Sequence, residues 1–212
     1  GNWSATGSWN GGAVAIDGNA LIFKGAGGVT NNDLGTLSAV PSLTFDAAAG
    51  AYTLNGNALT FGSNGILNSS SATQTIGLNL TQNANSSVTA TGGAIVFTGS
   101  LDNAGYALTL TGASNLTTSA LLGSGTITKT GVGSLTLNGA VATTTVNVSE
   151  GTLALGAADR LANGVTLTLS GAATFDLGGF ADTITTYNQS GTATLTNGTL
   201  TAANYNLTGG TI

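Results

Sequence analysis

A short phrase of alternating apolar and small polar residues, closed by glycine, recurs along the whole chain. It is clearest at residues 59–62, 108–112, 135–139 and 167–171, which read Leu-Thr-Phe-Gly, Leu-Thr-Leu-Thr-Gly, Leu-Thr-Leu-Asn-Gly and Leu-Thr-Leu-Ser-Gly. Alternation with a period of two is typical of a β-strand that buries one face and exposes the other to water. One such unit repeated at intervals of roughly 15–20 residues indicates a solenoid.

The repeat runs from end to end, so residues 1–212 are predicted to form a single elongated β-solenoid domain. Apolar positions at the three-and-four spacing of a helix do not recur, and only residues 157–161 are expected to make one helical turn. The predicted fold class is therefore all-β. The alternative is an antiparallel β-sandwich of the pilin-like kind, which also shows alternating strands.

The charge of the chain excludes one class of partner. The only basic residues are Lys24, Lys129 and Arg160, and the net charge is −5. Nucleic-acid binding is not expected, because phosphate neutralisation needs several Lys or Arg side chains on one face. No apolar run approaches the ~18–20 residues of a spanning helix, so no membrane span is predicted. The absence of cysteine gives no disulfide evidence about the compartment.

A longer motif lies in the middle of the chain. Residues 123–139, Gly-Ser-Gly-Thr-Ile-Thr-Lys-Thr-Gly-Val-Gly-Ser-Leu-Thr-Leu-Asn-Gly, resemble the autotransporter-associated β-strand repeat, also called the passenger-associated transport repeat. Residues 145–155 are similar to the second half of that unit, whereas residues 140–144 depart from its pattern. The resemblance implies a right-handed parallel β-helix on the bacterial exterior, in proteins often fused to a C-terminal translocating barrel.

If it folds as a right-handed parallel β-helix, the chain forms about ten rungs and a rod ~50 Å long. Each rung stacks on the next, and the inward-facing apolar side chains form columns along the axis. The predicted core residues are Ile22, Leu43, Phe45, Leu54, Leu59, Phe61, Ile76, Leu78, Leu80, Ile95, Phe97, Leu108, Leu110, Ile127, Leu135, Leu137, Val146, Val148, Leu153, Leu155, Leu167, Leu169, Phe175, Leu177 and Ile184.

Residues for catalysis or metal binding are few. Without His or Cys there is no triad base and no thiol nucleophile. Asp159, Asp176 and Asp182 lie about one rung apart near Arg160, a pattern that a polysaccharide-cleaving enzyme could use, but they are interpreted as turn and surface acids. The turn from Asp176 to Asp182 occurs once and not as a tandem calcium-binding array. We therefore predict no enzyme, no metal site and no cofactor.

Tyrosines are the candidate sugar-binding residues. Tyr52, Tyr106, Tyr187 and Tyr205 are expected to face solvent, where they could stack on glycans together with the many Asn and Thr side chains. Local packing is the favoured interpretation of these four residues.

The two ends of a solenoid present unpaired backbone groups that recruit another chain unless they are covered. Residues 1–20 are predicted to be an N-terminal cap or subunit-contact segment. Residues 195–212 contain no charged run and no proline, and are predicted to be an open C-terminal end. No signal precedes Gly1, so the chain is expected to be processed or excised from a longer protein. The predicted subunit contacts are Trp3, Trp9, Tyr205, Leu207 and Ile212.

These features predict a secreted, non-enzymatic structural protein of a bacterial cell surface. Its expected partner is a second copy of itself, stacked end to end in an extracellular filament or surface matrix. The alternative is a monomeric adhesin, an autotransporter-type passenger fragment that binds surface glycans. A third class, a polysaccharide-cleaving enzyme, requires a rung-aligned acid cluster in a groove.

Overall fold

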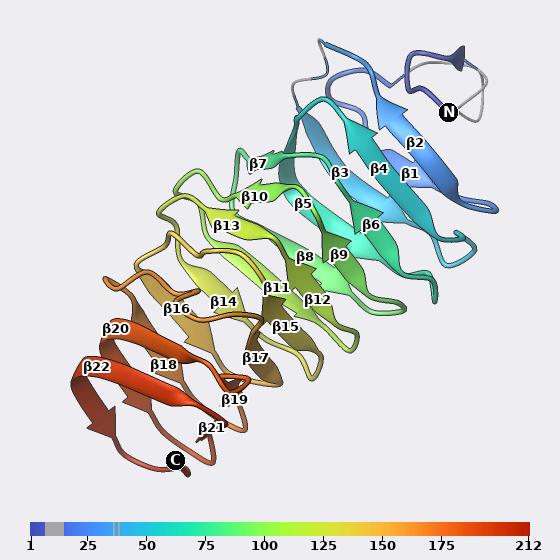
Figure 1. Ribbon diagram of the computed structural model, residues 1–212. Helices are drawn as coiled ribbons and strands as arrows, with labels where there is room; N and C mark the ends of the chain where they lie inside the picture. The colour runs from blue at the N-terminus through green and yellow to red at the C-terminus, as the bar shows by residue number, and fades with distance from the viewer. Residues whose placement is uncertain (7–14, 36, 38) are drawn as a thin grey trace.

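The protein is a rod of stacked β-strands (Figure 1). The computed structural model describes residues 1–6, 15–35, 37 and 39–212. Within them the chain winds through about nine turns, and every pairing between named strands is parallel. These residues contain no α-helix, and residues 157–159 form a bend where one helical turn was predicted. The predicted parallel β-solenoid is confirmed, with about nine turns instead of ten.

One side of the rod, here called face A, is a nine-stranded parallel sheet. It receives one strand from each turn in sequence order, as expected when a helical path returns to the same side after each turn. The strands of face A are β2 (Gly28–Asn32), β4 (Tyr52–Gly56), β6 (Gln74–Ile76), β9 (Ile95–Phe97), β12 (Leu116–Thr118), β15 (Ser134–Leu137), β17 (Thr152–Leu155), β19 (Thr174–Asp176) and β21 (Thr194–Thr196).

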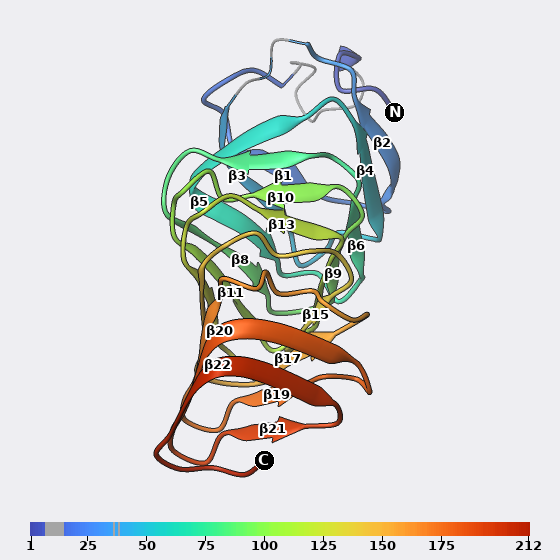
Figure 2. The same cartoon turned by 60° about the vertical axis from the view of Figure 1, so that its left-hand side comes forward.

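The other two sides, faces B and C, share a 13-stranded sheet because some strands bend around the corner between them (Figure 2). The long strands β5 (Leu59–Asn68), β20 (Ala181–Gln189) and β22 (Thr199–Leu207) make this bend. The other strands of face B are β1 (Leu21–Phe23), β3 (Val40–Phe45), β8 (Ser86–Ala90), β11 (Leu108–Gly112), β14 (Ile127–Lys129), β16 (Thr145–Val148) and β18 (Thr166–Leu169). Those of face C are β7 (Leu80–Gln82), β10 (Ser100–Asp102) and β13 (Ala120–Leu122).

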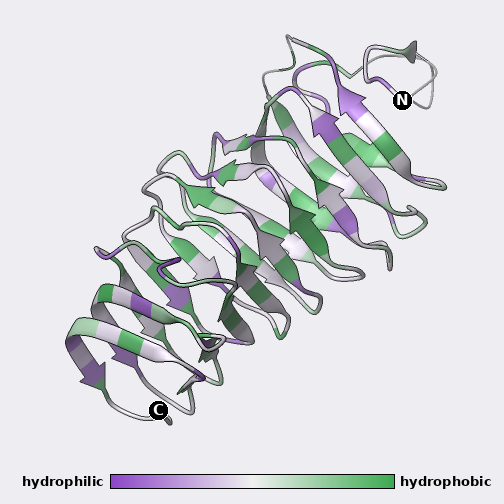
Figure 3. Cartoon of the chain, viewed as in Figure 1, coloured by the Kyte–Doolittle hydropathy of each residue, from purple (hydrophilic) through white to green (hydrophobic). Residues whose placement is uncertain are grey.

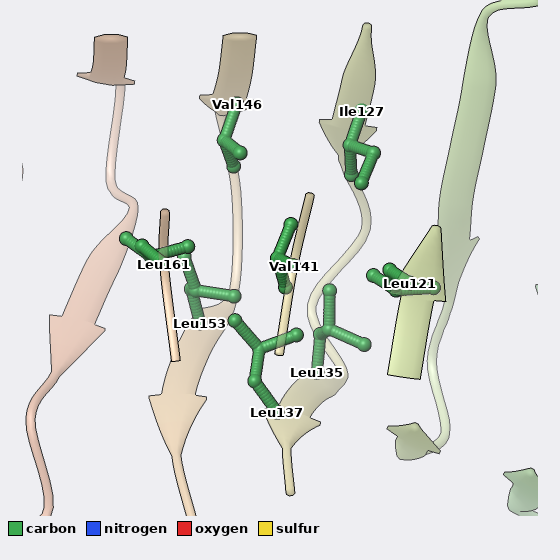
Figure 4. A pocket seen from close by; sticks show the side chains of 8 residues that line it. All are labelled: Leu121, Ile127, Leu135, Leu137, Val141, Val146, Leu153 and Leu161. Carbon is green, nitrogen blue, oxygen red and sulfur yellow. The ribbon is translucent and has the colours of Figure 1, made fainter. Parts of the chain in front are cut away.

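In-register stacking brings apolar residues of successive turns one above another, and Figure 3 shows hydrophobic residues recurring from strand to strand along the rod. On face A, Leu116, Leu135, Leu153, Phe175 and Leu195 lie one above another, and all are buried. Midway along the rod, side chains from all three faces fill the interior and leave no room for a water molecule (Figure 4). The residues that line this region are Leu121, Ile127, Leu135, Leu137, Val141, Val146, Leu153 and Leu161. The core in this region is therefore apolar and too closely packed to admit water.

The predicted core is confirmed except at Ile22, which is 51% exposed. Its neighbours Leu21 and Phe23 point inward and are buried, so alternation along β1 directs Ile22 outward. The error is one of register on a three-residue strand. Phe23 stacks on Phe45 of the next turn, with ring centroids 5.1 Å apart.

Buried polar side chains lie at corners, where the ladders leave backbone groups unpaired. Asn68 donates from Nδ2 to the carbonyl of Gly93 (2.9 Å) and accepts from the N–H of Ser70 (3.0 Å). Asn103 makes a similar connection, donating to the carbonyl of Gly125 (2.8 Å) and accepting from the N–H of the same residue (2.9 Å). Such side chains join successive turns and satisfy buried backbone groups.

Lys129 is a buried cation that lies in its column between the apolar residues Leu110 and Val148. Its Nζ donates to the carbonyl oxygens of Gly131 (2.6 Å) and Glu150 (3.2 Å) at the corner. Burial lowers the pKa of Lys129 below its usual value, and the Glu150 carboxylate opposes this shift. The ammonium group thus takes the donor role that asparagine has at other corners.

Successive turns stack closely at Gly139, so a substitution at this glycine tests the packing. A Cβ at Gly139 would overlap the carbonyl oxygen of Ser119 in the preceding turn, whereas one at Gly164 would meet nothing within 4 Å. We expect Gly139→Ala to lower the free energy of unfolding by about 1–3 kcal/mol, because the backbone must shift. Gly164→Ala is the control and should change little. Equal denaturation midpoints for the two variants, measured by circular dichroism, would refute this packing.

Candidate functional site

The two ends of the rod differ in how their outer strand edges are covered. At the N-terminal end, the first residues pair with the outer edge of β2. The N–H of Asn31 donates to the carbonyl of Gly1 (2.9 Å), and the N–H of Trp3 donates to the carbonyl of Asn31 (2.9 Å). Asn2 and Asn31 form a parallel bridge. This edge of face A is therefore covered by the chain itself.

Trp3 closes the N-terminal end of the core. Its side chain is fully buried and packs on Phe23, with ring centroids 6.0 Å apart, and its Nε1 donates to Oγ1 of Thr30 (2.8 Å). Next to it, hydrogen bonds from Ser4 hold the pKa of Asp33 below its usual value. Because the indole is enclosed by its own chain, its side chain presents no surface to another copy. The other tryptophan predicted for this end, Trp9, lies outside the described residues.

At the C-terminal end, β22 pairs with β20 through eight residue pairs, and its other edge has no strand partner among the described residues. Tyr205 and Leu207 continue the inward-facing columns of Tyr187 and Gln189. They are nevertheless 46% and 49% exposed. The apolar columns are thus open at this end.

The chain after β22 touches the end of face A at one point. Thr211 forms a parallel bridge with Thr194, and its carbonyl accepts from Nε2 of Gln189 (3.0 Å). Ile212, the third predicted contact at this end, is 69% exposed. Tyr205, Leu207 and Ile212 therefore all lie on the exposed C-terminal end, whereas Trp3 lies inside the other.

The four tyrosines do not form a common sugar-binding surface. The prediction that Tyr187 faces solvent is wrong: its ring is fully buried, its hydroxyl donates to Oε1 of Gln189 (2.5 Å), and burial raises its pKa. Tyr52 is half-buried against the aromatic residues near the N-terminal end. Tyr106 and Tyr205 are exposed but lie in different parts of the rod, in a turn before β11 and on the last strand.

The three acidic residues near the C-terminal end lie in different environments. Asp159 is exposed, and Asp176 accepts from the N–H of Gly178 (2.8 Å) in its own turn. Asp182 is buried and accepts from the backbone N–H of Arg160, whose guanidinium donates to two backbone carbonyls. The described part of the chain contains no group of three or more His, Cys, Asp or Glu residues arranged to hold a metal ion.

The buried polar residues were not predicted from the sequence, although the period-two alternation of the strands indicates two of them. Lys129 stands two residues after the buried Ile127, and Asp182 two before the buried Ile184, so period-two alternation directs both inward.

The described residues include no helix with the length and hydropathy to cross a bilayer. No family model, curated protein or solved structure matches this chain.

Proposed function

We propose that this chain is a non-enzymatic structural protein of a bacterial exterior whose rods join end to end through the turn that contains β22. The observation that supports this function is the C-terminal end itself, where an unpaired strand edge coincides with the exposed Tyr205 and Leu207 of the core columns. The rod consists of a dry core under a surface of small polar side chains, which suits a mechanical role. Low charge and abundant Gly, Thr, Asn and Ser fit a surface protein.

The edge of β22 lacks two of the features that usually prevent strand addition. Its sequence, Thr-Leu-Thr-Ala-Ala-Asn-Tyr-Asn-Leu, contains no charge and no proline. Near its corner the Tyr205 hydroxyl accepts from the N–H of Ala202 (2.9 Å) and donates to the carbonyl of Leu200 (2.6 Å), so strand addition is expected along the rest of the edge. An added strand would extend the ladder by backbone hydrogen bonds and cover the two open columns. A further turn of solenoid from any source satisfies this edge. We assign it to β22 of a second copy, because that strand supplies the same length and apolar spacing.

The size of the purified chain tests this function. We expect electron microscopy and light scattering at neutral pH to show particles longer than one rod of about nine turns, roughly 45 Å. Leu207→Lys should return the mass to that of a single chain, 20.4 kDa, because a lysine at an edge opposes strand addition. Val132→Lys is the control, since Val132 is also exposed but lies in a turn away from both ends.

Two results would contradict the proposal. Uniform single rods of the unaltered protein would remove end-to-end joining and favour the monomeric adhesin, which binding to immobilised glycans would then test. Long particles that persist in Leu207→Lys, or that are lost equally in Val132→Lys, would show that β22 is not the contact.

A further inference from the structure

Face C is interrupted near the C-terminal end of the rod. From β13 onward its turns are joined only by single bridges, Leu121 with Val141 and Val141 with Leu161. Beyond Leu161 the described residues show no bridge or strand pairing to β20, the next element on this face. Backbone hydrogen bonds join β20 to the preceding turn on either side of the gap, from the N–H of Asp159 to the carbonyl of Ala181 (3.0 Å) and from the N–H of Thr185 to the carbonyl of Val165 (3.0 Å).

A buried carboxylate takes the place of the missing ladder. Oδ2 of Asp182 accepts from the N–H of Arg160 (2.9 Å) and from the N–H of Leu161 (3.0 Å). The side chain is 1% exposed, and its Oδ1 is buried without a hydrogen-bond partner. One half of the carboxylate therefore holds the preceding turn, while the other half has lost its hydration without compensation.

The charged side chains around Asp182 do not compensate its negative charge. Asp159, on the turn that Asp182 holds, carries the same sign. Arg160 directs its guanidinium away, to the carbonyls of Ala158 (2.9 Å) and Asn138 (3.1 Å). The sheet neighbours of β20, β18 and β22, carry no charged side chain. An ionised Asp182 is thus a buried negative charge without a cation beside it, which weakens the contact that it makes.

We propose that Asp182 is an acid-responsive latch between residues 159–161 and β20: its protonation strengthens the attachment of the last turns, β20 to β22, and its ionisation weakens it. The neutral carboxyl keeps an oxygen that can accept from the two N–H groups, and it removes the uncompensated charge. This device goes beyond the proposed function, because it acts within one chain whether or not rods join.

The direction of the pH response follows from the environment of Asp182. Burial raises its pKa above the usual 3.8, against the opposing hydrogen bonds from Leu161 and Arg160, and the carboxylate of Asp159 raises it further. The folded state therefore binds more protons than the unfolded state between pH 3.8 and the raised value. Stability contributed by this group increases as the pH falls through the folded-state pKa and levels off below 3.8.

Hydrogen exchange of the whole chain between pH 7.5 and 4, corrected for intrinsic rates, tests the latch. In the unaltered protein, peptides covering residues 158–165 and 181–189 should gain protection in acid relative to residues 108–118. Each unit by which the pKa of Asp182 exceeds 3.8 should slow their exchange by about tenfold. Asp182→Asn should show no such response, with strong protection at every pH, because its amide oxygen still accepts from the two N–H groups.

Asp159→Asn is the matched control, since it removes an exposed carboxylate from the same joint. It should retain the response with a smaller amplitude, because one repulsive charge is gone. The proposal is overturned if the unaltered protein shows no acid-dependent gain relative to residues 108–118, or if Asp182→Asn retains the full gain. Should Asp182→Asn fail to fold, the unaltered protein and Asp159→Asn decide: the absence of an acid-dependent gain relative to residues 108–118 in both would refute the latch.

Discussion

Replacing Trp3 by alanine is expected to lower the free energy of unfolding of the N-terminal turns by about 3–5 kcal/mol, the usual loss for a fully buried tryptophan. The substitution removes the ring that packs on Phe23 and the hydrogen bond to Thr30. Turns of a solenoid contact only their neighbours, so the effect should be local. Hydrogen exchange should therefore increase in β1 and β2 and remain unchanged beyond β11.

Trp3→Phe separates packing from hydrogen bonding at this position. Phenylalanine keeps an aromatic ring over Phe23 but loses the bond to Thr30 and part of the indole's volume, so we expect a smaller loss of about 1–2 kcal/mol. If Trp3→Ala left exchange in β1 and β2 unchanged, Trp3 would not be the cap of this end. Equal effects of the two variants would show that the ring contributes little.

Replacing Asn68 by leucine should be comparably damaging, although leucine is similar in size and the site is fully buried. Its side chain accepts a hydrogen bond from the N–H of Ser70 and donates one to the carbonyl of Gly93. It also donates to two further carbonyl oxygens, which have other donors as well. Each buried backbone group left unsatisfied costs about 1–3 kcal/mol, so losing two gives about 2–6 kcal/mol. Chemical denaturation followed by circular dichroism measures this loss.

Asn147→Leu is the matched control for this substitution. Asn147 lies on the outer side of β16, where alternation directs it away from the core, so the change should alter stability by less than about 0.5 kcal/mol. If Asn68→Leu proved as stable as the unaltered protein, the corner asparagines would be dispensable turn residues, and the joining of turns would rest on the strand ladders alone.

Alternation along single strands was sufficient to predict the fold class and nearly all of the core. Leu135, Leu153 and Phe175 are buried because period-two parity decides which side of a strand faces the axis. A three-residue strand offers too few positions for alternation to show which side faces the axis, and this explains the error at Ile22. Tyr187 was expected to face solvent, but the register with Leu167 places its ring inside, in agreement with the local-packing interpretation of the tyrosines.

The ends and corners were harder to predict, because they depend on contacts between turns. Nothing in the local sequence indicates that Trp3 pairs with the backbone of Asn31 or that the carboxylate of Asp182 replaces a ladder at Leu161. These contacts join residues 21–28 positions apart, and their partners become known only when the turns are placed in register. A capped N-terminal end and an open C-terminal end were both expected from the sequence, whereas the pairing of the first residues with the edge of β2 was not.

The direction of the ladder hydrogen bonds also determines how this molecule would respond to force. The strands run across the rod, so the bonds between successive turns lie along its long axis (Figure 1). A pull on the two termini therefore loads the joints one at a time, and the outermost turn detaches before the next is strained. Each released turn adds up to ~3.3–3.6 Å of slack per residue. Such a chain behaves as a force-limiting tether that lengthens stepwise while its remaining turns stay folded.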